Sequence, residues 1–373
     1  MTQEIYDKVD WLQGVYDKSE SARSRRVADV SVNMFGYFCK NEGLTEGKMV
    51  KKYQTWKKED DIRSIGISLQ KFVSFLNHDQ DIILNEEIAP RPFKKLTSKT
   101  IRTYFGFVKA YLRKCHNVRL SIEDIKDFIT FPTPRKESRK AIPLETLKLI
   151  FDNASPSRRA LYYVLVSSGM RLGEALSLTP DNFHLDENPA RITIDADYTK
   201  TKESRETYIS SEAVEKLKPI IQDKKNDEKV LSDIDNIADP DDDDKMGHAV
   251  RIEDQYFKDL RIGLGLLEKY KNSNRYVVNI HGFRSYFHTK ASLKHGSEYA
   301  NALDGHGAYL KTYYNLPLDE RARKYKELEP SLFIDSFKLE TEKTLEKKYS
   351  DLENDMIEMQ AEFKRWKLIH ANP

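Results

Sequence analysis

Apolar residues recur at intervals of three and four along most of the chain, which is the period of an amphipathic helix. In the first third this spacing predicts helices from Ser21 to the stop at Gly43 and over about 46–57, 60–77, 98–115 and 121–130. Ser121 followed by Asp124 resembles a capping box at the start of the last helix. Residues 78–96 are interpreted as a loop. The pattern predicts a helical domain over residues 21–131, preceded by an N-terminal segment, 1–20, that is loosely ordered or a short helix.

The second half of the chain combines helices with one small sheet. Helices are predicted over about 144–154, 156–169, 171–178, 211–223, 252–270 and 282–294. Arg191–Asp195 and Glu206–Ser210 alternate between apolar and polar residues, as strands do, and predict a hairpin or meander. The predicted fold class is therefore mainly α (α+β), with a small antiparallel sheet in a second domain over residues 144–335.

Two polar stretches interrupt these elements. Residues 132–143 contain prolines that forbid a helix and four basic residues, so they predict an extended basic linker. Residues 224–250 are polar, with seven aspartates between Asp233 and Asp244, and are interpreted as an acidic mobile loop. A metal site is the alternative for this loop, but a carboxylate run without glycine-centred loop spacing is a weak ligand set.

The last segment, residues 336–373, carries a heptad pattern. Its apolar positions alternate in steps of four and three, which is typical of a coiled-coil seam: Leu345, Tyr349, Leu352, Met356, Met359, Phe363 and Trp366. The seam can pair with another copy or fold back onto the second domain. We favour self-association or packing on a neighbouring protomer, and so predict a C-terminal coiled-coil-like helix.

Composition narrows the class of protein. The chain has 373 residues, 39% hydrophobic and 33% charged, which suits a two-domain soluble protein, and no apolar run approaches the length of a membrane span. Cys39 and Cys115 are its two cysteines, so we expect a reducing cytosol and no disulfide framework. The motifs contain no zinc spacing and no phosphate-binding loop, and no metal, nucleotide or other cofactor is predicted.

Positive charge is concentrated in one block. The net charge is +2, but residues 91–140 hold 14 Lys and Arg against 4 Asp and Glu. Such a block favours a polyanion partner, most often nucleic acid, and a solvated basic face is the alternative. The candidate DNA-binding residues are Lys94, Lys95, Lys99, Arg102, Lys109, Arg113, Lys114, Arg135, Lys136, Arg139 and Lys140.

A set of polar residues in the second domain suits phosphodiester chemistry. In chain order it comprises Arg171, Glu174, Lys200, His281, Arg284, His306 and Tyr313. Two arginines can hold the non-bridging oxygens of a phosphate that gains negative charge in its transition state. A tyrosine nucleophile needs a group that takes its proton, and the leaving oxygen needs a group that gives one. A phosphotyrosine ester keeps the bond energy, so the strand can be resealed without a cofactor.

These residues resemble the motifs of the tyrosine recombinase/integrase family, in phage-type and archaeal style. Three segments carry the resemblance: Ser168–Glu174 (Ser-Gly-Met-Arg-Leu-Gly-Glu), Thr199–Arg205 (Thr-Lys-Thr-Lys-Glu-Ser-Arg) and His281–His288 (His-Gly-Phe-Arg-Ser-Tyr-Phe-His). The resemblance covers roughly residues 144–335. It implies a mostly helical catalytic domain there, and a helical, SAM-like core-binding domain upstream of the linker.

The resemblance also implies a role for each residue. Arg171 and Arg284 would hold the scissile phosphate, His306 would hydrogen-bond it, and Glu174 would support Arg171. Lys200 would protonate the leaving 5′ oxygen, and His281 would exchange a proton with the tyrosine. Tyr313 would attack and form a 3′-phosphotyrosine.

Two assignments keep alternatives. The family's spacing from the second histidine favours Tyr314 as the nucleophile, while the residues that follow favour Tyr313, which we select. Lys202 is the alternative to Lys200. The histidines His248, His288 and His295 are interpreted as surface or packing residues, and Tyr309 and Tyr325 as core or helix-packing residues.

The predicted function is site-specific DNA recombination or integration, as in mobile genetic elements, without metal or ATP. The alternatives are type IB topoisomerase-like relaxation of DNA and non-catalytic DNA binding. The expected partner is double-stranded DNA, bound by a homo-tetramer on two sites. The expected location is the cytoplasm, associated with DNA in the nucleoid.

Overall fold

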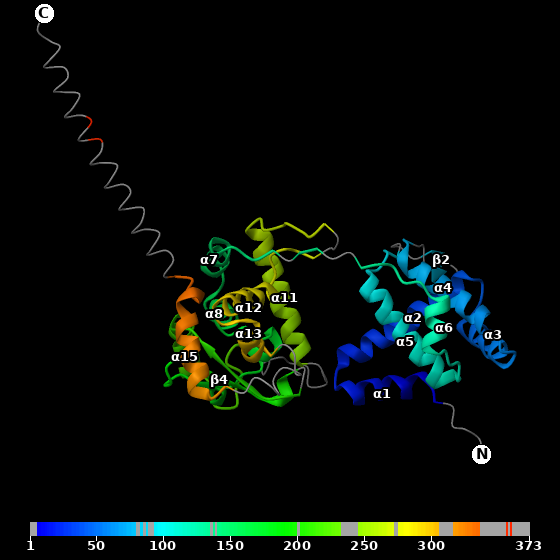
Figure 1. Ribbon diagram of the computed structural model, residues 1–373, viewed down its shortest axis with the longest axis horizontal. Coiled ribbons are helices and arrows are strands. Elements are labelled where there is room, and N and C mark those ends of the chain that lie inside the picture. The colour runs from blue at the N-terminus through cyan, green and yellow to red at the C-terminus, as the bar shows by residue number, and fades with distance from the viewer. Residues whose placement is uncertain are drawn as a thin grey trace, which may run out of the picture. The chain divides into compact units, whose positions relative to one another are not determined.

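The computed structural model describes residues 6–79, 83–84, 87–88, 93–134, 137–138, 140–199, 202–232, 245–271, 275–305 and 316–335, together with Met356 and Met359 (Figure 1). The chain divides into two compact units. Unit 1 comprises residues 1–138 and 271–273, and unit 2 comprises residues 139–270 and 274–373.

Unit 1 is a helical bundle around an aromatic core. Phe35, Phe38, Tyr53 and Phe72 are almost completely buried. The rings that contact one another, Phe35 with Tyr53, Phe35 with Phe72 and Phe38 with Phe72, have centroids 5.5 to 6.2 Å apart. Aromatic rings at these separations gain stability beyond the area that they bury. The elements of the unit are α1 (Lys8–Ser19), α2 (Ala22–Asn41), α3 (Glu46–Lys58), α4 (Ile62–Asn77), β1 (Ile83–Leu84), β2 (Glu87–Ile88), α5 (Ser98–His116) and α6 (Ile122–Phe128).

Side-chain caps fix where these helices begin. The cap residue of each helix accepts a hydrogen bond from a backbone N–H three residues later, and these residues are Asp7, Ser21, Thr45, Asp61, Thr97 and Ser121. Each cap satisfies a donor that the helix itself leaves without a partner. The capping box predicted at Ser121 and Asp124 is confirmed, because both of its hydrogen bonds are present.

Two segments of unit 1 have more structure than the sequence pattern indicated. Within the first twenty residues, α1 buries Trp11 against Tyr111 of α5, so this helix is part of the bundle. The predicted loop 78–96 contains the short antiparallel pair β1 and β2. Strands of two residues are too short to produce an alternating pattern, so the sequence could not indicate them.

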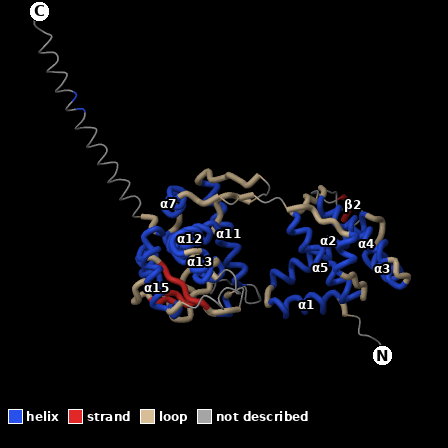
Figure 2. The backbone as a smooth tube through the Cα atoms, viewed as in Figure 1, coloured by secondary structure: helices blue, strands red, loops and turns tan. Residues whose placement is uncertain are grey.

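Unit 2 places helices around a three-stranded antiparallel sheet in the order β3–β4–β5 (Figure 2). Ile192 of β4 pairs with Thr207 of β5, and Ile194 pairs with Arg205. The central helix, α8, is buried from Ala160 to Ser168. The elements of the unit are α7 (Leu144–Asp152), α8 (Pro156–Ser168), α9 (Leu172–Leu176), η1 (Pro180–Asn182), β3 (Phe183–His184), β4 (Ala190–Ile194), η2 (Ala196–Tyr198), β5 (Arg205–Ile209), α10 (Ser211–Gln222), α11 (Lys245–Gly263), α12 (His281–His295), α13 (Ser297–Asp304), α15 (Leu318–Leu328) and η4 (Glu329–Leu332).

The acidic loop predicted over residues 224–250 is too long at its C-terminal end. Helix α11 begins at Lys245, because Met246, Ala249 and Val250 pack against the core of unit 2. At the other end, the Val230 N–H donates to the Leu178 carbonyl at 2.9 Å, and Val230 is buried. The aspartate run, residues 233–244, lies outside the described residues.

The C-terminal heptad segment also lies outside the described residues, apart from Met356 and Met359, which are helical and exposed.

Two described helices, α13 and α15, were not predicted from the pattern. In α15 only Tyr325 and Leu328 are buried, which is too few apolar positions to produce a helical period. Tyr325 is confirmed as a core residue, and its hydroxyl donates to the Ser167 carbonyl at 2.7 Å.

Cys39 and Cys115 are buried free thiols, and burial raises their pKa values to about 12 and about 11. Neither thiol is therefore poised to react as a thiolate.

In the part of the chain that the structure describes, every helix is too short or too polar to cross a membrane.

The close approach of α6 to α4 yields a stability prediction. A Cβ on Gly66 would lie 2.5 Å from the Phe128 Cβ, so Gly66→Ala forces α6 away from α4. We expect a net loss of about 1–2 kcal/mol after the gain in helix propensity, measured as a lower melting temperature. Gly106→Ala in α5 is the control, because a Cβ there meets nothing within 4 Å. It should raise stability by about 0.5–1 kcal/mol, and equal shifts for the two variants would contradict the packing argument.

Candidate active site

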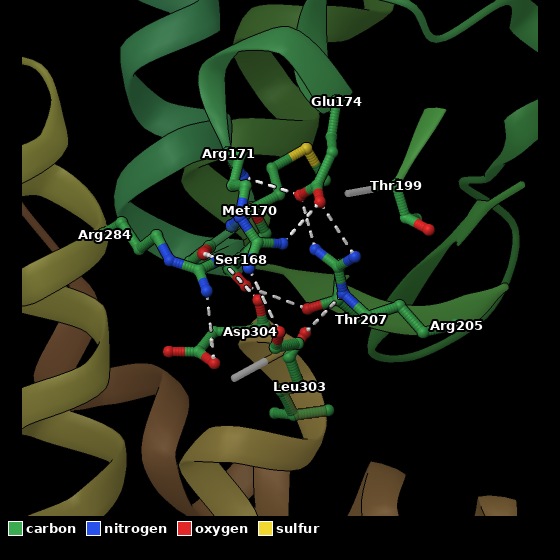
Figure 3. A network of polar contacts seen from close by, with 12 residues as sticks. Ser168, Met170, Arg171, Glu174, Thr199, Arg205, Thr207, Arg284, Leu303 and Asp304 are labelled. Atoms are coloured by element: carbon green, nitrogen blue, oxygen red, sulfur yellow. Dashed lines mark hydrogen bonds and ion pairs between the residues drawn. The ribbon is translucent and has the colours of Figure 1, made fainter. Parts of the chain in front are cut away.

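Glu174 is the acceptor that organises the polar cluster in unit 2 (Figure 3). Arg171 is the N-cap of α9, and its backbone N–H donates to Glu174 Oε2 at 2.7 Å. The Arg171 side chain returns to the same carboxylate, with Nη1 2.8 Å from Oε1. The spacing of three residues therefore lets the N3 carboxylate of Glu174 accept from both the backbone and the side chain of the N-cap residue, which turns the guanidinium back over the start of the helix.

Arg205 reaches the same carboxylate from the sheet. It begins β5, and its Nη1 and Nη2 lie 3.1 and 2.5 Å from the two oxygens of Glu174. Both side chains are almost fully buried, at 4% and 2% exposure. A bidentate pair of this kind compensates the cost of burying both charges. Glu174 therefore joins α9 to β5 as well as supporting Arg171.

Arg284 approaches the cluster from α12, where it is 3% exposed. Its Nη1 donates to the Gly169 carbonyl at 2.6 Å and to the Asp304 carbonyl. Its Nη2 forms an ion pair with Asp304 Oδ1 at 3.5 Å. The other oxygen of Asp304 lies 2.8 Å from His288 Nδ1, one turn further along α12.

Three arginines bind three consecutive carbonyls at the C-terminal end of α13. Arg205 Nε donates to the Leu303 carbonyl at 3.2 Å, Arg284 donates to the Asp304 carbonyl, and Arg171 Nη2 donates to the Gly305 carbonyl at 3.2 Å. The last carbonyls of a helix have no partner inside the helix and carry its negative dipole charge. The helix end thus gathers three cations from three other elements.

Gly169 makes the close approach of α8 and α12 possible. It ends α8 in the left-handed region, with φ of 67°, and a Cβ there would lie 2.2 Å from Phe287 Cδ1. A side chain is therefore excluded by both the backbone conformation and the neighbouring ring. This turn places Arg171 at the start of α9 and directs the Gly169 carbonyl to Arg284.

The neighbours of Glu174 and Arg284 shift the pKa values of both groups. Burial raises the pKa of Glu174, but the hydrogen bonds and charges of Arg205 and Arg171 outweigh burial and hold that pKa below its ordinary value. Burial lowers the pKa of Arg284 to about 10, the charge of Arg171 acts in the same direction, and Asp304 opposes both. Within the described residues, each side chain of the cluster contacts a group of opposite charge or a polar group. These side chains are Arg171, Glu174, Arg205, Arg284 and Asp304.

Comparison with known proteins gives one family. Residues 141–296 match the model of the phage integrase family. The chain carries a phage integrase family domain. The resemblance to tyrosine recombinases and integrases is therefore confirmed for this part of the chain, as is the mainly α fold class with its small antiparallel sheet. Comparison with curated protein sequences gave no match.

Among solved structures, the chain is similar to several recombinases. XerA recombinase is 15% identical, with 80% of this chain and 98% of that chain covered and a TM-score of 0.33. XerH recombinase bound to its difH substrate is 19% identical, with 68% of each chain covered and a TM-score of 0.41. The integrase from mycobacterium phage Brujita is 16% identical, with 86% and 91% covered and a TM-score of 0.39. The family assignment rests on the domain match alone.

Unit 2 brings together three of the site residues selected from the sequence. Arg171 and Glu174 are in direct contact, and Arg284 binds the carbonyl next to the one that Arg171 binds. His281 is the first residue of α12 and is exposed, whereas Arg284 on the same helix is buried. The remaining site residues, Lys200, His306, Tyr313 and the alternative Tyr314, lie outside the described residues.

The sequence analysis missed the carboxylate that serves Arg284. Asp304 is completely buried and contacts both Arg284 and His288, which had been interpreted as a surface or packing residue. The only signal in the sequence was an acidic residue directly before Gly305, because the helix that Asp304 ends was not predicted. Arg205 ends one of the three segments that carry the family resemblance, but its bidentate contact with Glu174 was not foreseen. His295 is confirmed as a packing residue, against Tyr299.

The candidate DNA-binding residues fall into three groups. Lys99, Arg102, Lys109 and Arg113 lie on one side of α5, next to the buried face that includes Val108 and Leu112. Lys94 and Lys140 form ion pairs with Asp79 and Glu268, and Lys95 and Lys114 are exposed. The linker residues Arg135, Lys136 and Arg139 lie outside the described residues.

Glu174 yields a pH-dependent stability prediction. In Glu174→Gln the buried Arg205 loses its counter-charge, and we expect a loss of about 3–5 kcal/mol in the free energy of unfolding at pH 7. The pKa of Glu174 is lowered in the folded state, so its contribution is complete above the ordinary carboxyl pKa of about 4.3 and is lost as pH falls through the lowered value. Denaturant unfolding of both proteins between pH 7 and pH 3 measures this difference.

The control is Glu187→Gln, which breaks a partly exposed pair with Arg191. That substitution should cost about 0–1 kcal/mol. A difference between wild type and Glu174→Gln that stays constant down to pH 3 would show that the carboxylate charge does not stabilise the site.

Proposed function

We propose that the protein is a site-specific DNA recombinase or integrase that cuts and rejoins strands through a 3′-phosphotyrosine intermediate. The proposal rests on the integrase-family domain and on one geometric observation. Arg171 and Arg284 are 113 positions apart in sequence, yet they bind the adjacent carbonyls of Gly305 and Asp304. Two guanidinium groups fixed at one point can hold the non-bridging oxygens of a single phosphate.

The charge balance of the cluster supports a phosphate ligand. Three arginines, Arg171, Arg205 and Arg284, are matched by two carboxylates, Glu174 and Asp304. These five side chains therefore carry one surplus positive charge, which complements the single negative charge of a phosphodiester. Arg171 is 30% exposed and Arg284 is 3% exposed. A DNA phosphate would thus meet Arg171 at the surface and Arg284 beneath it.

The remaining roles follow from the family resemblance and complete the reaction. The Tyr313 oxygen attacks the phosphorus and forms a new P–O bond, while the bond from phosphorus to the 5′ oxygen breaks. His281 takes the tyrosine proton, Lys200 gives a proton to the leaving 5′ oxygen, and His306 hydrogen-bonds the phosphate. The reverse attack by a 5′ hydroxyl reseals the strand, so the ester conserves the bond energy and neither metal nor ATP is required.

The basic side of α5, where Lys99, Arg102 and Arg113 are exposed and Lys109 is half-buried, would bind the DNA backbone. Lys99, Arg102, Lys109 and Arg113 can contact successive phosphates without reading the bases. Recombination exchanges four strands, so the active form would be a homo-tetramer on two DNA sites, acting in the cytoplasm on nucleoid DNA. The heptad segment at residues 345–366 could assist that assembly. Such an enzyme fits a mobile genetic element.

The first test is covalent trapping of DNA. A pool of nicked duplexes with a randomised central region is incubated with the full chain, denatured in detergent, and the protein-linked DNA is recovered and sequenced. We expect an adduct with a 5′-labelled scissile strand and none with a 3′-labelled strand, because the tyrosine keeps the 3′ phosphate. Tyr313→Phe should abolish the adduct, and Arg171→Ala should slow its formation about 100- to 1000-fold.

Tyr314→Phe is the matched control and should leave the adduct intact. If Tyr314→Phe abolishes trapping and Tyr313→Phe does not, the nucleophile is Tyr314 and the reaction class stands. An adduct unaffected by both substitutions would refute tyrosine chemistry. Relaxed plasmid without exchanged ends would indicate the topoisomerase-like alternative, and DNA binding without any adduct the non-catalytic one.

The basic side of α5 yields a salt-dependence prediction. Lys99→Ala and Arg113→Ala should each weaken binding to unrelated duplexes and reduce the slope of log K against log salt by about 1. Lys58→Ala removes an exposed charge from α3 and serves as the charge-matched control, with an unchanged slope. Fluorescence anisotropy between 50 and 300 mM salt, about the range in which counterion release is measured, gives these slopes. Equal slopes for all four proteins would contradict a phosphate-binding role for α5.

A further inference from the structure

Asp304 occupies a position that two physical effects disfavour. It is the last residue of α13, where the negative end of the helix dipole opposes a carboxylate. It is also completely buried, so its ionised form loses hydration. An apolar side chain of similar volume would avoid both costs. The carboxylate is stabilised here only by the cationic and polar groups that surround it.

Each oxygen of this carboxylate has its own partner. Oδ1 forms the ion pair with Arg284 Nη2 at 3.5 Å, and Oδ2 lies 2.8 Å from His288 Nδ1. The backbone carbonyl of Asp304 accepts from Arg284 Nη1. One residue therefore contacts both ends of the Arg284 fork. His288 follows Arg284 by one turn of α12 and is 34% exposed, so it covers the carboxylate from the surface side.

We propose that Asp304 is a positioning residue for the phosphate clamp and that His288 holds its carboxylate in place. The inference rests on the proposed strand transfer. The Gly169 and Asp304 carbonyls hold Nη1, and a guanidinium held through this nitrogen can still tilt about it. The contact of Oδ1 with Nη2 limits that tilt and sets the direction of the second nitrogen. Arg284 then meets the phosphate in one orientation, prepared before DNA binds.

A positioning role separates the rate of cleavage from the affinity for DNA. Most of the affinity for DNA comes from many phosphate contacts, so one misaligned fork changes it little. The chemical step depends on the orientation of that fork toward the developing charge. Loss of the Asp304 carboxylate should therefore slow cleavage while DNA binding is kept.

The experiment measures single-turnover cleavage of a nicked duplex selected from the randomised pool. We expect Asp304→Asn to slow adduct formation about 10- to 100-fold, with the dissociation constant for the same duplex unchanged within about 2-fold. His288→Leu should slow cleavage in the same direction. His288→Asn should restore it, because the asparagine amide can place a donor where Nδ1 lies. Asp304→Asn combined with His288→Leu should be no slower than Asp304→Asn alone.

A second measurement reports the Arg284 fork without any DNA. In full-length protein carrying isotope-labelled arginine, the two Nη groups of Arg284 should give separate NMR signals, assigned by their loss in Arg284→Lys. In Asp304→Asn the Nη2 signal should change position and its protons should exchange faster with water, because Nη2 has lost the charged oxygen Oδ1. The Nη1 signal should change little, because its two backbone acceptors remain. Thermal unfolding of each variant shows that it is folded under the conditions used.

The outcomes distinguish the two proposals. An Nη2 signal with the same position and the same exchange rate in Asp304→Asn would overturn the positioning role, whether or not cleavage slows. Wild-type cleavage rates in Asp304→Asn would also overturn it. If the Nη2 signal changes in Asp304→Asn but the wild-type protein never forms an adduct, Asp304 orders Arg284 and the proposed recombinase function fails instead.

Discussion

The C-terminal end of α13 is the constraint on which the candidate site depends. Its last three carbonyls are bound by Arg205 from β5, Arg284 from α12 and Arg171 from the start of α9. Three positive groups would repel one another if nothing held them. The helix end supplies aligned acceptors and a negative partial charge, and the carboxylates of Glu174 and Asp304 supply the remaining compensation. Unit 2 therefore builds a cationic site largely from backbone.

The parts of this site that were predictable are those whose geometry is local. Arg171 and Glu174 are three residues apart at a helix start, where helix geometry brings an N3 carboxylate back to the N-cap backbone N–H. Arg284 could be selected through its motif. The pairs Arg205–Glu174 and Arg284–Asp304 join residues from different elements, and no periodicity in the sequence relates them. They depend on how α9, β5, α12 and α13 pack, which a single sequence does not specify.

The helices and strands likewise fall into those that the sequence predicts and those that depend on tertiary packing. Helices with a strong apolar face and a side-chain cap, such as α2 and α5, were predicted to within a few residues. In contrast, α13 and α15 were missed, since α15 is mostly polar and α13 has only eight residues. The third strand, β3, contains only Phe183 and His184 and cannot show alternation. Unit 2 thus shows that short elements next to a site are determined by tertiary contacts.

Sharing one helix end also has a consequence for how sequence changes act at a distance. Arg171, Arg205 and Arg284 cannot shift independently, because each is bound to a neighbouring carbonyl of the same turn. A substitution that frays or rotates α13, even at its first residue, Ser297, would displace all three acceptors together. The eight residues of this helix are therefore a mechanically coupled part of the site, although most of their side chains never approach the phosphate. Natural substitutions within Ser297–Asp304 can therefore alter the site through the position of these carbonyls, without any contact between the substituted side chain and the phosphate.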